Sequence, residues 1–126
     1  MAAITRVKAR PCTVVGYEVV DKCVLGGDVV AGDLLKMTGA MSSGLPVMTK
    51  AAAATTEVDG IALQDGFNGQ GGFDYGIHGE MDGFSGLTPG AAAYPSGSVA
   101  GGLDTTAAGS IRIKAVTPSR IRYSFV

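Results

Sequence analysis

The sequence predicts an all-β domain with mainly antiparallel strands: a small compact β-barrel, β-sandwich or β-tulip-like fold with long glycine-rich loops. Short runs of β-branched and apolar residues alternate with Gly, Asp-Gly or Pro along the chain, and 20 of its 126 residues are glycine. Helical periodicity is hard to find, and residues 50–57 (KAAAATTE) are the one stretch rich in good helix formers. At most one short helix is therefore expected.

Length and composition indicate a single domain that buries a core. The chain has 126 residues, of which 46% are hydrophobic, so wholesale disorder is not expected. Charged residues make up 17%, below the usual quarter. This low charge suggests a surface that partner molecules cover.

The apolar runs and the turn residues between them set the expected strands. In chain order these lie near Ile4–Ala9, Thr13–Val20, Asp28–Val30, Leu34–Thr38, Leu45–Lys50, Gly60–Gln64, Phe73–His78, Ala91–Tyr94, Leu103–Thr105, Ile111–Val116 and Ser119–Val126.

The last two strands have the clearest pattern. Apolar and basic residues alternate in both Ile111–Val116 and Arg120–Phe125, so each strand has one apolar face and one basic face. Thr117-Pro118 supplies the turn between them. The sequence thus predicts an antiparallel pair with a ladder of basic side chains opposite the core.

Two segments of the chain match without a gap at an offset of 58 residues. Duplication and chance similarity in a glycine-rich chain both remain open as the cause. In either case both segments are expected to form wide hairpins. The matched positions are Gly32 with Gly90, Gly39 with Gly97, Gly44 with Gly102, and Leu45 with Leu103.

The charges are distributed unevenly along the chain. No Lys or Arg lies between residues 51 and 111, and that stretch carries seven acidic residues: Glu57, Asp59, Asp65, Asp74, Glu80, Asp82 and Asp104. The basic residues lie towards the two ends, so the molecule would be electrostatically two-sided if the ends meet. Such an arrangement would set the orientation of docking more than its affinity.

Cysteines and apolar runs bear on where the protein works. Cys12 and Cys23 are too few for a disulfide framework or a zinc site, and they are either buried thiols or a bridge between neighbouring strands. No signal peptide is visible, and no apolar run approaches the roughly 18 to 20 residues that span a bilayer. We expect a protein made in a cytosol, with no membrane partner.

The residues that could carry chemistry lack the arrangement that chemistry needs. His78 is the sole histidine, and its neighbours Asp82 and Ser85 are close in sequence without triad spacing. The Asp-Gly steps are turn signals and form no calcium loop, although calcium binding stays open. The loop at 66–75 has no phosphate-loop ending. No catalytic residue, cofactor or metal site is expected.

Two further interpretations concern surfaces. Phe67 and Phe73, in the glycine-dense loop, are candidates for a subunit interface, with a role in the core at least as plausible for each. The basic strands could bind nucleic acid, but Tyr123 is the one aromatic residue that alternates with them, so no nucleic-acid partner is expected.

Several segments together resemble the small capsid decoration proteins of tailed bacteriophages, also called cement or head-stabilising proteins. The resemblance covers about residues 25–126. Its most specific part is LTPGAAAYPS at 87–96 with the following GGL at 101–103. Further segments are GDVVAGDLL at 27–35, VDGIAL at 58–63 and the closing RIRYSFV at 120–126.

The resemblance implies a non-enzymatic virion protein on the capsid exterior, made in the bacterial host cytoplasm. It would bind the major capsid protein, form a homotrimer, and stabilise the assembled head by clamping neighbouring capsid subunits. Residues 1–12 would be an arm that adds a strand to a capsid sheet, and 13–126 a single β domain. The implied capsid contacts are Ile4, Arg6, Val7, Lys8 and Arg10. The subunit-interface candidates are Phe67, Phe73, Tyr94, Arg120 and Arg122.

Two alternatives stay open. VVAGDLL at 29–35 also resembles the short hairpin of β-clip and antifreeze-like domains, which implies a ligand-binding or enzymatic domain. A head-fibre or tail component of the same kind of virion is the other alternative.

Overall fold

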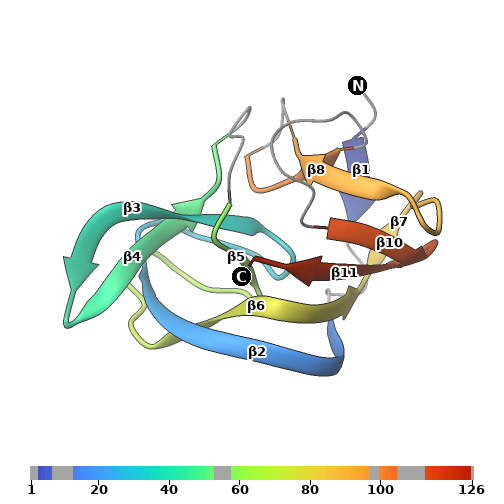
Figure 1. The fold of residues 1–126 in the computed structure, drawn as a ribbon. Helices are drawn as coiled ribbons and strands as arrows, with labels where there is room; N and C mark the ends of the chain where they lie inside the picture. Colours follow the sequence, from blue (N-terminus) through green and yellow to red (C-terminus); the bar gives the residue numbers. More distant parts are fainter. Residues whose placement is uncertain (1–2, 7–12, 53–57, 97–99, 105–112, 126) are drawn as a thin grey trace.

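The computed structural model describes residues 3–6, 13–52, 58–96, 100–104 and 113–125, and its backbone is all β within these ranges. No helix occurs in them, and residues 53–57 of the expected short helix lie outside them. The strands are β1 (Ala3–Arg6), β2 (Thr13–Leu25), β3 (Leu34–Ser42), β4 (Leu45–Lys50), β5 (Gly60–Ala62), β6 (Phe73–Asp82), β7 (Phe84–Ser85), β8 (Ala92–Pro95), β9 (Leu103–Asp104), β10 (Ile113–Thr117) and β11 (Arg120–Ser124). The all-β prediction is confirmed (Figure 1).

The strands differ from the expected ones in length and in number: β3 and β6 run on to Ser42 and Asp82, beyond the expected Thr38 and His78, and β5 ends at Ala62 instead of Gln64. β2 runs on to Leu25, because its second half pairs with β6 and then with β4. The expected strand at Asp28–Val30 is reduced to a single bridge between Val29 and Gly66, since turns on both sides leave no room for more. The two-residue strand β7 was not expected.

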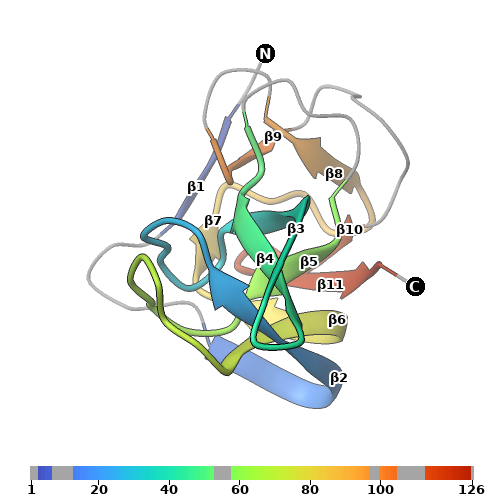
Figure 2. The same cartoon turned by 90° about the vertical axis from the view of Figure 1, so that its left-hand side faces the viewer.

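Five strands pair in a closed ring, which makes the first half of the molecule a small barrel. The order is β2–β4–β3–β5–β6, and the pairing of β6 with β2 closes it. The β2–β4 pair is parallel, whereas the other four pairs of the ring are antiparallel. In Figure 2 these strands occupy the lower part of the molecule.

Strand β6 continues beyond this ring into the second half. Along one edge it pairs with β2, and along the other it pairs first with β5 and then with β11. From β11 the sheet continues through β10, β8, β9, β1 and β7. The predicted C-terminal pair is β10–β11, joined at Thr117–Arg120 and antiparallel as expected.

Two apolar cores lie on opposite sides of the shared strands, because side chains alternate between the faces of a strand. Leu35, Ala62 and Phe73 belong to the core inside the ring, whereas Leu34 and Ile61 belong to the larger core of the second half. Adjacent residues of β3 and β5 therefore contribute to different cores.

The hairpins expected at an offset of 58 residues are both present. β3 and β8 begin at Leu34 and Ala92, and β4 and β9 begin at Leu45 and Leu103, so each pair of strands is separated by this offset. β3 pairs antiparallel with β4, and β8 with β9.

The hydrogen bonds before these hairpins repeat as well. The Gly32 N–H donates to the Ala62 carbonyl, and the Ala62 N–H donates to the Asp33 carbonyl; 58 residues after Gly32, Gly90 bonds to Ala115 and Ala115 to Ala91 in the same way. Gly32 and Gly90 have φ of 92° and 86°, a region that favours glycine. The match in sequence thus reflects a repeated structure.

Gly76 tests how closely the core of the second half packs against β6. A Cβ atom there would lie 2.5 Å from the Tyr123 hydroxyl and 2.9 Å from Leu63 Cδ2. Since Tyr123 is fully buried and cannot move aside freely, we expect Gly76→Ala to lower the free energy of unfolding by roughly 1–3 kcal/mol. Gly71→Ala, whose Cβ would meet nothing within 4 Å, is the matched control and should change stability by less than about 0.5 kcal/mol. Urea denaturation of both variants measures the difference, and equal midpoints would contradict close packing at β6.

Candidate interaction surfaces

The hairpin of β3 and β4 projects from the barrel (Figure 1) and is exposed over its outer half. No charged residue lies between Lys36 and Lys50. Met41 is 69% exposed at the outer end, and Met37 is exposed on the same strand. Methionine side chains are flexible and polarisable, and they are frequent at surfaces that bind other proteins. The outer half of this hairpin is therefore an uncharged, partly apolar contact surface.

The turn of this hairpin follows from two residues. Ser43 and Gly44 have φ of 53° and 78°, and positive φ at both central residues is the condition of the tight two-residue hairpin turn. Among the residues that the structure describes, Ser43 is the one non-glycine residue with a positive φ. The turn holds Ser42 opposite Leu45 and fixes where the hairpin ends.

The outer edge of β3 is not a regular strand edge. The Met37 N–H donates to Asp59 Oδ2 at 2.8 Å, and the Ala40 N–H donates to Thr38 Oγ1 at 3.2 Å. The register also shifts between Met37 and Met41, where Gly39 has φ of 90°. Irregular edges of this kind hinder pairing with a foreign strand. The hairpin thus offers side chains, rather than a row of backbone groups, to a partner.

A second surface lies beside the single bridge of Val29 with Gly66. Val29 is buried, and a Cβ on Gly66 would collide with Leu25 and Phe73, so the bridge itself faces the core. The four residues next to it are all exposed. We call this set, namely Asp28, Val30, Asp65 and Phe67, the Phe67 surface.

The loop that carries Phe67 is held on both sides by hydrogen bonds. The Phe67 N–H donates to Gln70 Oε1 at 3.1 Å, and the Gln70 N–H donates to the Phe67 carbonyl at 3.0 Å. The Leu25 N–H donates to the Gln70 carbonyl, and the Gly69 N–H to the Leu25 carbonyl. The Phe67 backbone is fixed while its side chain stays 63% exposed.

The two carboxylates of this surface also hold backbone. Asp28 Oδ1 accepts from the Asn68 N–H at 2.8 Å, and Asp65 Oδ1 accepts from the Ala31 N–H at 2.9 Å. Each bond uses one carboxylate oxygen, so the negative charge remains at the surface. Among the described residues, neither aspartate forms an ion pair with a Lys or Arg side chain within 4 Å.

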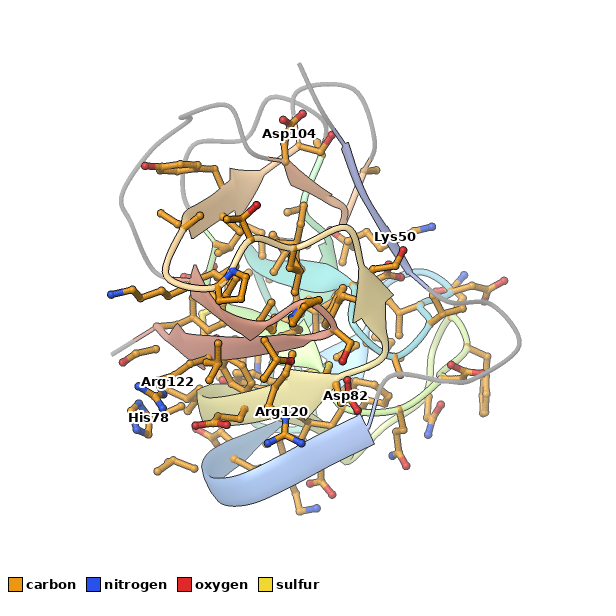
Figure 3. The ribbon with its side chains drawn as sticks, turned by 90° about the vertical axis from the view of Figure 1, so that its right-hand side faces the viewer. Lys50, His78, Asp82, Asp104, Arg120 and Arg122 are labelled. Atoms are coloured by element: carbon orange, nitrogen blue, oxygen red, sulfur yellow. The ribbon has the colours of Figure 1, made fainter. Side chains whose placement is uncertain are left out.

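A third surface is the polar face of β6 and β11. The Arg122 Nη2 and Nε atoms lie 2.9 and 3.1 Å from Glu80 Oε2, and Arg120 Nη1 lies 4.0 Å from Glu80 Oε1. Figure 3 shows Arg122 beside His78 and Arg120 closer to Asp82. Lys114 and Arg122 lie opposite each other on the exposed face of β10 and β11, as the basic ladder predicts, and β6 adds acidic residues beside them, so the whole face carries mixed charge.

The other predicted interface residues differ in how far they are buried. Phe73 is fully buried in the core of the ring and cannot contact a partner, which corrects its proposed place in a subunit interface. Alternation along β6 turns it inward. Tyr94 is half-buried on β8, opposite Asp104. Arg122 is exposed, and Arg120 is half-buried.

The N-terminal candidates are partly described. Ile4 pairs with Leu103 of β9, and Arg6 with Phe84 of β7, so Ala3–Arg6 is a strand of its own chain's sheet. Val7, Lys8 and Arg10 lie outside the described residues.

The described part of the chain holds no cluster of metal ligands. No group of three or more of its His, Cys, Asp or Glu residues could hold a metal ion. Asp33, the charged residue of the β-clip-like segment, is 1% exposed, and its Oδ2 accepts from the Val30 N–H. This carboxylate stabilises a turn. In the described part of the chain, no helix is long and apolar enough to cross a membrane.

No protein family model matches the chain, and no curated protein or solved structure matches it either. The assignment of function therefore depends on the surfaces described above and on the resemblance of its sequence segments.

Cys23 is a buried free thiol, while Cys12 lies outside the described residues. Burial, with a smaller effect of the nearby Asp21 and Asp74 charges, raises the pKa of the Cys23 thiol to about 11. Since the reactive form is the thiolate, a rise from 9.0 to about 11 lowers its fraction at pH 8 roughly a hundredfold.

We expect the Cys23 thiol to react slowly with a disulfide reagent at pH 8 in the folded Cys12→Ser variant, and rapidly once that variant is unfolded in guanidinium chloride. The raised pKa also makes the folded state hold its proton where the unfolded state loses it. Stability should consequently fall as the pH rises from about 9 to about 11. Fast labelling of the native variant would contradict the slow reaction, and a stability that stays constant over this pH range would contradict the raised pKa.

Proposed function

We propose that this protein is a non-enzymatic structural protein of a bacteriophage virion that binds the outer surface of the assembled head and clamps neighbouring major capsid subunits. The observation that carries the proposal is the projecting β3–β4 hairpin, whose outer half is exposed and has no charge between Lys36 and Lys50. An exposed surface that combines apolar side chains with no charge is better suited to burial against a protein than to permanent contact with water.

The sequence resemblance supports the same proposal from another side. Its segments coincide with structural features: LTPGAAAYPS at 87–96 contains the turn before β8 and β8 itself, and GGL at 101–103 leads into β9. The second hairpin of the repeat is thus the part of the chain that most resembles decoration proteins.

Under this proposal, binding of the protein would stabilise the assembled head by mass action. A protein that binds the assembled shell and not its dissociated subunits shifts the equilibrium towards the shell. Many copies on a symmetric lattice, arranged as homotrimers under this proposal, add their effects. The Met37 and Met41 side chains would supply apolar contact on each copy.

The N-terminal arm remains part of the proposal in altered form. Because Ala3–Arg6 pairs with β7 and β9, an arm that adds a strand to a capsid sheet would have to leave these partners. The basic residues of the segment, Arg6, Lys8 and Arg10, are proposed to contact an acidic capsid surface.

Co-sedimentation with undecorated, expanded heads of the phage that encodes the chain tests the proposed function. The protein should bind at micromolar concentration. Replacing both Met37 and Met41 by Ser should weaken binding by at least about tenfold, since two apolar contacts are lost. Thr88→Ala, an exposed site away from the hairpin, is the control. Absence of binding by the unchanged protein would refute the proposed function. Equal binding of the double variant would show only that the hairpin is not a contact with the head.

A second expectation concerns charge. Replacing Arg6, Lys8 and Arg10 together by Ala should weaken head binding at low salt and flatten its dependence on salt concentration, because screened attraction to an acidic surface is removed. Binding isotherms at 50 and 300 mM NaCl measure both effects. Unchanged affinity and salt dependence would show that these three residues do not contact the capsid.

A further inference from the structure

We propose that the Phe67 surface docks into an apolar recess on the head whose rim carries Lys or Arg side chains. This inference rests on the proposed function, and it adds a second contact, different in chemistry from the uncharged hairpin. Its basis is the combination of an exposed aromatic side chain, a neighbouring exposed valine and two carboxylates on two segments that the bridge of Val29 with Gly66 holds together.

The shape of the loop is fixed before any partner binds. The bridge of Val29 with Gly66 and the hydrogen bonds that join Gln70 with Leu25 and with Phe67 hold the backbone on both sides of the aromatic residue. A side chain presented by an ordered backbone loses less conformational entropy on binding than one on a mobile loop. Aromatic residues are enriched among the side chains that dominate binding energy. Phe67 is thus suited to be the anchor of an interface.

The neighbours of Phe67 define the kind of recess that fits it. Val30 is 48% exposed and extends the apolar area. Because Val29 and Gly66 form the bridge, Phe67 lies opposite Asp28, and Val30 lies opposite Asp65. Two apolar side chains are accordingly accompanied by two negative charges.

Charge complementarity then selects the partner. No Lys or Arg occurs between residues 51 and 111, so the sequence around Phe67 supplies no cation. The two carboxylates keep their charge while they accept backbone hydrogen bonds. Opposite charges around an apolar contact orient a complex and favour its formation. The recess should therefore be basic at its rim.

The test is co-sedimentation of purified variants with the same undecorated heads. Phe67→Ala should weaken binding about tenfold. Val20→Ala, which shortens an exposed side chain of β2 outside the Phe67 surface, should leave binding unchanged. Thermal unfolding of both variants should match the unchanged protein, because the altered side chains are exposed.

The charge component has its own variant. Asp28→Asn with Asp65→Asn keeps an oxygen acceptor for the Asn68 and Ala31 N–H groups and removes both charges. At 50 mM NaCl this variant should bind about two- to fivefold more weakly, and its affinity should depend less on salt.

The outcomes separate this inference from the proposed function. If the unchanged protein fails to bind heads, both fall. If it binds and Phe67→Ala binds equally well, the Phe67 surface is not a head contact and the proposed function stands. Loss of self-association in Phe67→Ala by sedimentation velocity, with head binding retained, would assign the surface to a second copy and overturn the inference. An unchanged salt dependence in the double Asn variant would contradict the proposal that the rim of the recess is basic.

Discussion

Strand β6 connects the two halves of the molecule, and the rest of the fold depends on its packing. One edge pairs with β2, and the other is divided between β5 and β11. The first half of the strand contributes Phe73 and Tyr75 to one core, and Met81, further along the strand, belongs to the other. Gly76 allows the buried Tyr123 ring to approach the strand. A larger residue there would push Tyr123 and Leu63 of the second-half core away from the strand.

This framework explains why the candidate contact surfaces lie where they do. The β3–β4 hairpin begins inside the cores at Leu34 and Leu35 and leaves them after two residues. The Phe67 loop is anchored by the bridge of Val29 with Gly66, which also faces the core. Both surfaces are therefore rigidly attached while their side chains remain exposed. Such attachment suits a protein that acts by holding its partners in place.

The three surfaces differ in charge, and the differences bear on what each can bind. The hairpin is uncharged, the Phe67 surface combines apolar area with two carboxylates, and the face of β6 and β11 pairs Arg122 and Arg120 with Glu80. Exposed ion pairs add little to stability, of the order of 0–1 kcal/mol. Glu80 offsets part of the arginine charge, so that face is less suited to a strongly acidic partner than the sequence suggested.

The sequence by itself determined the all-β class, the position of most strands and the repeated hairpins, because these depend on local patterns. Alternation in Ile113–Thr117 and Arg120–Ser124 specifies a pair of strands, and the glycines at 32 and 90 specify the same turn twice. The tertiary structure alone decided which side chains meet. Phe67 and Phe73 flank one glycine-rich segment, yet Phe67 is exposed and Phe73 is buried, because Phe73 begins β6 and the pairing of β6 with β2 turns it inward. Glu80 likewise reaches Arg122 from 42 positions away in the chain, and no local pattern indicates such a distant neighbour.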